Sequence, residues 1–388
     1  MYNNFKKNDF LEVIKLLKSD NPKLTQGKNV KKFEQKWSKW LGVKYSIFVN
    51  SGSLANLITI TALKNLKKIS KKNEIILPSL TWSSDVSSVI FNNFKPIFVD
   101  VNLENLSMDL NHVRKKINKK TLAVFITHAQ GFNGLNQKFV NYLRKKNIIL
   151  IEDVCESHGA KMEKYKLGSI GFASNFSFYY AHHMSTIEGG MICTNNKDFY
   201  QNCRVLRSHG MAREIGDIRL EKKIIKKHTD LSPKFIFLNP GFNMRNNEIG
   251  ALIGISQLKK LDSNNKIRTK NFKYFLKNLN GKKYFINYNI KGSSNYAFPV
   301  ILKKRNTSNR DLFEKILIKK GIEFRRGNAG GGNQTKQPYV KKLLNINQKE
   351  LTNVNIIHDY RYYIGNYPSL SKKQILQLTN VLNSIEFN

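Results

Sequence analysis

Five short apolar runs, separated by helical stretches, constrain the fold of the first 255 residues. The runs occupy residues 45–50, 74–78, 95–101, 122–128 and 147–153. Continuous apolar strands of this kind are typical of a parallel sheet that helices cover on both faces. Ligands of such sheets gather at the carboxyl ends of the strands. The pattern therefore predicts an α/β fold with a mostly parallel central sheet and a ligand site at one edge of it.

The pattern changes to a mixed α+β one after residue 256. The elements expected there are helices and strands at 257–279, 296–302, 309–320, 322–325 and 372–385. We therefore expect two domains. A large α/β domain would span residues 1–255, with the N-terminal segment packed on it, and a small α+β domain would span residues 256–388.

The net charge of +39 raises the question of nucleic-acid binding. Only 13 of the 66 basic residues are arginine, and lysines are scattered along the whole chain. A face that binds phosphates usually favours clustered arginine, because the guanidinium group makes paired hydrogen bonds. We interpret the charge as a solvated lysine-rich surface and expect no nucleic-acid partner. A nucleic-acid site is the alternative interpretation.

The sequence predicts a cytoplasmic protein without a membrane partner or a metal site. No apolar stretch approaches the roughly 20 residues that a membrane span needs, and the polar, amphipathic start is unlike a signal peptide. Three cysteines, Cys155, Cys193 and Cys203, form no CxxC pair and no disulfide framework. They also fall short of the four thiols that usually hold an iron–sulfur cluster.

Small polar residues at 50–56 follow the first strand and open a helix. The N–H groups at a helix N-terminus bind anions, so a phosphate site is one interpretation. Ordinary helix capping is the other. The strand at 147–153 ends in Glu152 and Asp153. A buried acid there would suit the protonated ring nitrogen of a cofactor, or it would cap a helix.

An aromatic strand at 176–180 leads into His182 and His183, followed by Glu188 and two glycines. Paired histidines at a strand end, next to a hydroxyl and a Gly-Gly turn, indicate acid–base chemistry. Metal binding is the alternative. Adjacent residues of a strand point to opposite faces, which makes the two histidines poor co-ligands.

A further segment, 241–246, precedes a helix expected to end at residues 257–258. In order and spacing, these motifs together resemble the DegT/DnrJ/EryC1/StrS family of pyridoxal-phosphate-dependent nucleotide-sugar aminotransferases. The resemblance covers nearly the whole chain. It implies the fold of type I pyridoxal-phosphate-dependent transferases, which is the aspartate aminotransferase-like fold.

The resemblance also implies a cofactor site. Gly52 and Ser53 match the phosphate loop of the family, and Ser177 matches a serine that also binds the phosphate. Asn243 matches an asparagine that reaches the cofactor of the partner subunit, so the resemblance implies a homodimer with shared active sites.

Three further positions match residues around the cofactor ring. Trp82 matches the aromatic residue that stacks on the ring, and Asp153 matches the acid that pairs with the ring nitrogen. Glu156 falls where the family usually has Gln or His beside the ring.

The chain departs from the family at His182. The family places its cofactor-binding lysine five residues after the serine and six before the glutamate of Glu-Gly-Gly. Both counts, from Ser177 and from Glu188, lead to His182. Three lysines precede the serine in an expected surface hairpin, and we expect none to substitute: Lys161, Lys164 and Lys166.

Histidine cannot form the covalent bond of the lysine, but it can act as a general base with a pKa near neutrality. The segment looks closest to the branch of GDP-4-keto-6-deoxy-D-mannose 3-dehydratases. That likeness implies noncovalently held pyridoxamine phosphate, loss of the C3 hydroxyl of a nucleotide-linked 4-keto-6-deoxyhexose, and L-glutamate as the co-substrate that restores the amine. Such a reaction belongs to deoxysugar biosynthesis for surface polysaccharide, such as lipopolysaccharide O-antigen.

Two alternatives remain open, namely an aminotransferase-like enzyme of the same family and a noncatalytic binder of sugar nucleotides. Five side chains are candidate contacts for the substrate: His209, Arg213, Arg245, Arg325 and Arg326. Arginine suits diphosphate because it makes paired hydrogen bonds. His209 follows an expected helix, so capping its end is the alternative role. The loop at 330–332 is either a flexible surface loop or one that closes over a ligand.

Overall fold

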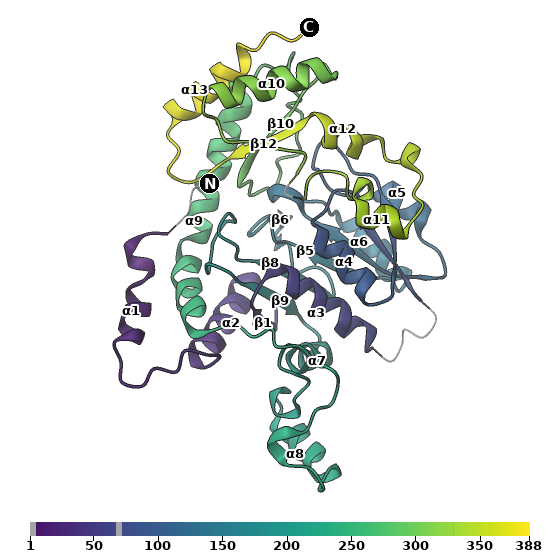
Figure 1. Cartoon of the computed structure of the whole chain (residues 1–388), viewed down its shortest axis with the longest axis vertical. Coiled ribbons are helices and arrows are strands. Elements are labelled where there is room, and N and C mark those ends of the chain that lie inside the picture. Colours follow the sequence, from purple (N-terminus) through teal and green to yellow (C-terminus); the bar gives the residue numbers. More distant parts are fainter. Residues whose placement is uncertain (1–4, 67–71, 329) are drawn as a thin grey trace.

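A computed structural model describes residues 5–66, 72–328 and 330–388. A seven-stranded sheet forms its centre, in the strand order β1-β9-β8-β5-β4-β2-β3 (Figure 1). Its strands are β1 (Tyr45–Val49), β2 (Glu74–Pro78), β3 (Lys95–Val99), β4 (Thr121–Thr127), β5 (Ile149–Asp153), β8 (Ala173–Ser177) and β9 (Gly190–Thr194). Strand β9 alone runs opposite to the other six strands, so the expectation of a mostly parallel sheet is confirmed.

Helices cover both faces of this sheet. The described helices are α1 (Leu11–Leu17), α2 (Lys28–Leu41), α3 (Gly52–Lys64), α4 (Ser83–Phe91), α5 (Leu110–Lys116), α6 (Gln137–Lys145), α7 (Lys197–Arg207), α8 (Ile218–Lys227), α9 (Glu248–Asn278), α10 (Thr307–Lys319), α11 (Pro338–Leu343), α12 (Thr352–Tyr360) and α13 (Lys372–Asn383). The apolar sides of α2, α5, α6 and α9 pack on one face of the sheet, and α3, α4 and α7 pack on the other. Successive strand residues alternate between these two layers, as Ile47 and Phe48 do.

The C-terminal part has a smaller sheet and an apolar core of its own. Its three strands, β10 (Ala297–Ile301), β12 (Arg361–Gly365) and β11 (Arg325–Arg326), pair antiparallel. The core around Phe298 and Tyr362 also takes in residues from loops of the large sheet, among them Phe132. The two parts therefore pack directly against each other.

Two expectations about the C-terminal elements were wrong in detail. The helix expected to end at 257–258 continues without a break to Asn278, so α9 runs along both parts of the chain (Figure 1). The strand expected at 322–325 is reduced to Arg325 and Arg326.

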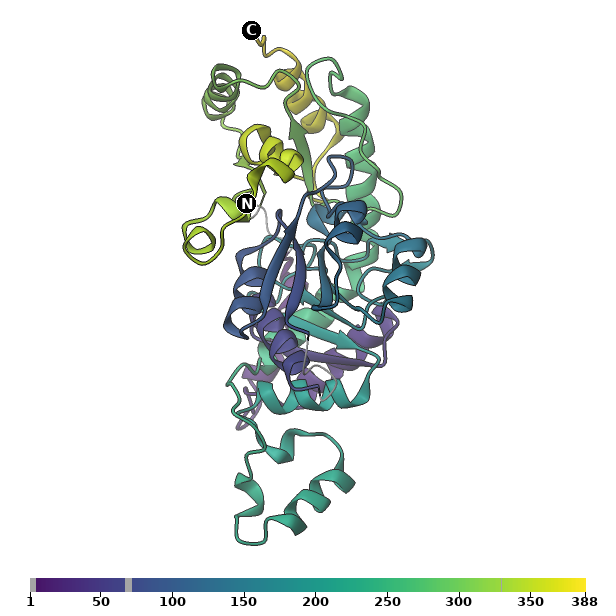
Figure 2. The ribbon, with the colours of Figure 1, turned by 90° about the vertical axis from the view of Figure 1, so that its right-hand side faces the viewer.

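A projecting arm follows α7 and carries α8 (Figures 1 and 2). No residue of α8 is buried. The arm exposes four large apolar side chains: Ile218, Leu231, Phe235 and Phe237. Within the described ranges, the chain has no helix that is both long and apolar enough to cross a membrane.

Candidate active site

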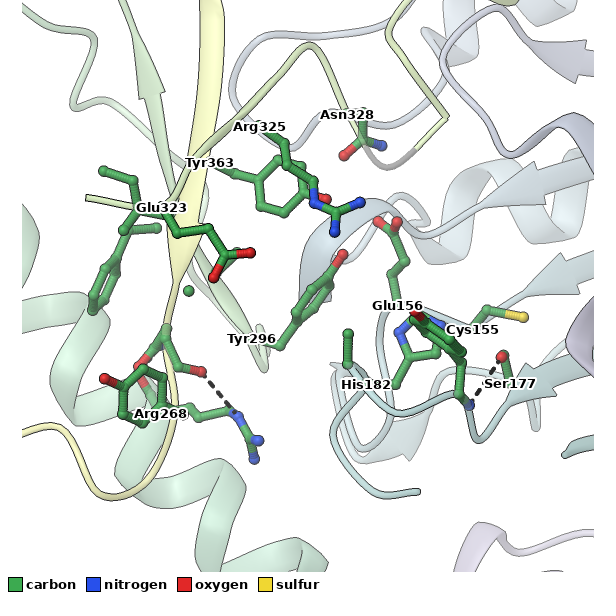
Figure 3. Close-up of a pocket in the computed structure, with 18 of the residues that line it drawn as sticks. Cys155, Glu156, Ser177, His182, Arg268, Tyr296, Glu323, Arg325, Asn328 and Tyr363 are labelled. Carbon is green, nitrogen blue, oxygen red and sulfur yellow. Dashed lines mark hydrogen bonds between the residues drawn. The ribbon is translucent and has the colours of Figure 1, made fainter. Parts of the chain in front are cut away.

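A cavity of about 900 Å³ lies where the carboxyl ends of the parallel strands meet the C-terminal part. The large sheet and its loops contribute Glu156, Ser177 and His182 to its wall, and the C-terminal part contributes Tyr296 and Arg325 (Figure 3). Titratable groups of both signs therefore face one enclosed space that is large enough for a cofactor and a substrate.

The N-terminus of α3 forms one end of the cavity. Ser51 caps the helix, because its Oγ accepts a hydrogen bond from Leu54 N at 3.1 Å. Gly52 and Ser53 lie in the first turn, where backbone N–H groups have no acceptor within the helix, and both residues line the cavity. Ser51 therefore caps the helix, and the backbone N–H groups of Gly52 and Ser53 remain available to bind an anion.

Close packing at this point depends on Gly52. A Cβ atom on Gly52 would lie 2.5 Å from the Cβ of Ser177, the last residue of β8. The Ser177 side chain also lines the cavity. The first turn of α3 and the Ser177 hydroxyl thus form a cradle that suits a phosphate group.

Asp153, the last residue of β5, lies in the floor of the cavity and is 3% exposed. Its Oδ1 accepts from Cys155 N at 2.8 Å, and its Oδ2 accepts from Asn56 Nδ2 at 3.1 Å. No helix begins in the segment after β5, so the alternative role of a helix cap is wrong. The neighbouring Glu152 accepts hydrogen bonds from the backbone N–H groups of Gly168, Ile170 and Gly171 and is structural.

The two histidines lie in a loop rather than at the end of a strand, which corrects the expectation of a strand at 176–180. Strand β8 ends at Ser177. The loop is closed at Phe178, whose N–H donates to Gly189 O and whose carbonyl accepts from Thr186 N. Within the loop, His182 faces the cavity. His183 is fully buried, and its Nε2 contacts Ser294 O at 2.5 Å.

The base strength of His182 also differs from the expectation. Burial lowers the pKa of His182 to about 4, although the Asp153 carboxylate opposes the shift. The expected pKa near neutrality is therefore wrong for the protein alone. A phosphate and a diphosphate bound in the cavity would raise the pKa, because anions favour the charged imidazole. At neutral pH the free imidazole is uncharged and can accept a proton.

Glu156 belongs to a buried polar network beside the cavity. Its Oε2 accepts from Gln130 N at 2.8 Å, and the side chain of Gln130 bonds to Arg361. Burial raises the pKa of Glu156 to about 7, while the Gln130 N–H lowers it and Asp153 raises it further. This carboxyl is thus poised to hold or release a proton near neutral pH.

Trp82 precedes α4 and lines the cavity with 45% of its surface exposed. An indole in this state has a face available for a ring. The glycine loop lies close by, because a Cβ atom on Gly330 would be 2.3 Å from Thr81 O. Its neighbours Gly331 and Gly332 have positive φ angles of 77° and 88°, which other residues rarely adopt.

Four of the expected contacts lie outside this cavity, near the base of the projecting arm or on it. Asn243 Oδ1 accepts from Arg245 Nε at 3.2 Å. Arg213 donates to Lys234 O at 3.3 Å, and His209 follows α7 with a positive φ of 62°. None of the four residues lines the cavity.

The two adjacent arginines of β11 differ in their surroundings. Arg325 lines the cavity, as expected for a substrate contact (Figure 3). Arg326 donates to Glu314 Oε1 at 3.2 Å and does not line it.

Sequence reasoning missed several cavity residues. Asn56 had a signal, since an amide in the apolar helix α3 is unusual. Asp85, a buried acid that accepts a hydrogen bond from Asn56, was also missed, but it does not itself line the cavity. Arg268 and Tyr296 had no local signal, because only the packing of the C-terminal part brings them to the cavity. Among the described residues, no group of three or more His, Cys, Asp or Glu side chains could hold a metal ion.

The sheet order and the site at its carboxyl edge place the chain among pyridoxal-phosphate-dependent transferases of the aspartate aminotransferase type. Within this class it belongs to the DegT/DnrJ/EryC1/StrS aminotransferase family, whose model matches residues 3–385.

Individual relatives narrow the comparison. The chain is 32% identical over 370 residues to GDP-4-keto-6-deoxy-D-mannose 3-dehydratase of Yersinia pseudotuberculosis. The match covers 94% of this chain and 93% of the relative. A GDP-4-keto-6-deoxymannose-3-dehydratase structure with a trapped PLP-glutamate geminal diamine is 29% identical, with a TM-score of 0.87 and 98% of each chain covered. A mutant of that enzyme, ColD, with bound GDP-perosamine is 28% identical, with a TM-score of 0.85 and the same coverage.

Proposed function

We propose that this chain is a pyridoxal-phosphate-dependent 3-dehydratase, which removes the C3 hydroxyl of a nucleotide-linked 4-keto-6-deoxyhexose. GDP-4-keto-6-deoxy-D-mannose is the substrate we favour, because the relatives named for it match almost the whole chain. One observation carries the proposal: His182, which the sequence spacing assigns to the position of the family's lysine, faces the cavity, and no lysine is among the described residues that line it.

The residues present fit the cofactor. Gly52 and Ser53 would bind the phosphate through the N-terminus of α3, with the Ser177 hydroxyl opposite. The Asp153 carboxylate would face the ring nitrogen, held in place by Cys155 N and Asn56 Nδ2. An ionised acid in a buried floor favours a protonated ring nitrogen.

Bound pyridoxamine phosphate supplies an amine that condenses with the 4-keto group and a ring that accepts electrons. His182 would accept a proton on its uncharged imidazole and return it to the departing C3 hydroxyl, which leaves as water. Asp153 would hold the ring nitrogen in its protonated form, and this would favour the departure. Trp82 would pack on the ring and keep water from one side of it.

Glutamate is the proposed amine donor, in keeping with the adduct in the related structure. Arg325 and Arg268 are the cationic side chains that line the described cavity. Guanidinium groups pair with carboxylates and phosphates. The same wall would therefore hold the glutamate carboxylate and the diphosphate of the sugar nucleotide in successive half-reactions.

A homodimer with shared sites is the proposed assembly. The arm exposes Phe235 and Phe237, each with more than half of its surface accessible. Exposed apolar side chains on a projecting element mark a contact surface. In such a dimer Asn243 would reach the phosphate site of the partner subunit, and the arginines near the arm would reach its substrate.

Product analysis tests the proposal. Purified protein, pyridoxamine phosphate, glutamate and GDP-4-keto-6-deoxymannose are mixed, and the sugar nucleotide is examined by mass spectrometry. We expect loss of one oxygen at C3. A 4-amino sugar would show an aminotransferase instead, and nucleotide binding without turnover of any keto sugar would show a noncatalytic binder.

A further inference from the structure

Asp85 is a second carboxyl group beneath the cofactor site, and no step proposed above uses it. It lies in the first turn of α4 and is fully buried. Its Oδ1 is 2.5 Å from Asn56 Nδ2, and the same nitrogen is 3.1 Å from Asp153 Oδ2. Two carboxyl groups therefore meet at one amide nitrogen in the floor of the cavity.

The other oxygen of Asp85 belongs to a closed triangle of three oxygens. Thr127 Oγ1 lies 2.9 Å from Asp85 Oδ2 and 2.6 Å from Thr81 Oγ1, and Thr81 Oγ1 is also hydrogen-bonded to Asp85 Oδ2. Three oxygen–oxygen contacts require three hydrogens, and two threonine hydroxyls supply only two. A proton on Asp85 supplies the third. Without it, two buried oxygens would face each other with lone pairs alone.

The surroundings of Asp85 also favour its protonated form. Burial and the neighbouring Asp153 raise the pKa of Asp85 well above its ordinary value, more strongly than the two threonines lower it. Among the described residues, Cys155, which follows β5, and Tyr339 of α11 also interact electrostatically with Asp85. None of these three neighbours is a cation that would stabilise an ionised Asp85.

We propose that Asp85 is held as a neutral carboxylic acid and is a positioning residue, which leaves Asp153 as the single negative charge of the pair. The proton removes the repulsion between the two acids and lets Asn56 hold Asp153 toward the cavity. The protonation itself is a property of the cofactor-free protein. Its role toward the ring nitrogen rests on the proposed function.

Infrared spectroscopy of cofactor-free protein with ¹³C-labelled aspartate tests the proton directly. At neutral pH we expect the C=O band of a protonated aspartic acid in the wild type and its loss in Asp85→Asn. Labelling only aspartate excludes Glu156. A wild-type spectrum with carboxylate bands alone would overturn the proposal, whether or not the variant folds.

Binding of pyridoxamine phosphate, measured by equilibrium titration, tests the positioning role. Asp85→Val removes the contacts to Asn56 and the threonines, and it should weaken binding roughly tenfold. The neutral isostere Asp85→Asn should bind pyridoxamine phosphate nearly as tightly as the wild type. An Asp85→Asn variant as weak as Asp85→Val would show that a negative charge is needed and would overturn the role. Wild-type protein that binds no cofactor would overturn the proposed function, while the infrared band would still decide the proton.

Discussion

Gly52 and Ser177 approach so closely that a Cβ on the glycine would lie 2.5 Å from the Cβ of the serine. Any side chain at residue 52 must therefore displace β8 or the first turn of α3, the two elements that form the phosphate cradle. We predict that Gly52→Ala weakens the binding of pyridoxamine phosphate by about tenfold or more. Equilibrium titration of the purified variant measures this.

Gly365→Ala is the matched control, because its new Cβ would lie 3.8 Å from Tyr367, an ordinary contact distance. We expect its cofactor affinity to stay within about twofold of the wild type. Equal losses in both variants would contradict the assignment of the cradle.

Burial raises the pKa of Glu156 to about 7 from its ordinary 4.5. Between these pH values the folded chain keeps a proton that the unfolded chain has released, so this group lowers the free energy of unfolding as pH rises. We predict that Glu156→Gln gains stability over the wild type across this window, by roughly 3 kcal/mol in total, and then levels off. Urea unfolding of the cofactor-free proteins at several pH values measures the difference, and a difference independent of pH would refute the prediction.

A buried ion pair joins α7 to α2. Arg207 Nη1 lies 2.8 Å from Glu34 Oε1, and the same oxygen accepts from Phe48 N. We predict that Arg207→Met lowers the free energy of unfolding by about 3–5 kcal/mol, because it leaves a buried carboxylate without its cation. Thermal and urea unfolding measure the loss.

Lys197→Met is the control for this pair, because the bridge from Lys197 to Asp217 lies at the surface. We expect no measurable change in its unfolding. An Arg207→Met variant whose free energy of unfolding also stays unchanged would show that Glu34 finds another partner.

Shared active sites predict complementation between two inactive variants. Asn243→Ala and His182→Gln should each be inactive alone, whereas a mixed dimer holds one site with both native residues. An equal mixture after subunit exchange should regain about one quarter of the wild-type activity. Exchange is verified by native mass spectrometry, and mixed dimers without activity would show that Asn243 serves its own subunit.

The sheet could be predicted from its apolar runs, because continuous burial on both faces leaves a local signal. The runs at 74–78 and 147–153 match β2 and β5 to within two residues. Strand β9 was missed, since the glycines at 189–190 were interpreted only as a turn. The break in the strand expected at 176–180 could not be predicted, because the contacts of Phe178 that close the loop come from residues 186 and 189.

The cavity wall formed by the large sheet could also be predicted, since Gly52, Asp153 and Ser177 lie at the ends of strands or the start of a helix. His182 was found from its spacing to Ser177, although it lies in the loop that follows β8. The wall formed by the C-terminal part could not be predicted. Arg268 and Tyr296 reach the cavity through tertiary packing of α9 and β10. The burial that lowers the pKa of His182 also depends on this packing and has no counterpart in the local sequence.

Replacement of the anchoring lysine by His182 is tested most directly by intact-protein mass after borohydride reduction in the presence of pyridoxal phosphate. Reduction fixes any bond between a lysine and the cofactor. We predict that the wild type, freed of excess pyridoxal phosphate by gel filtration before reduction, keeps its unmodified mass and that His182→Lys treated in the same way gains one pyridoxyl phosphate group at residue 182. A wild type labelled on any lysine of the cavity region, or a His182→Lys variant that stays unlabelled, would contradict the position assigned to His182.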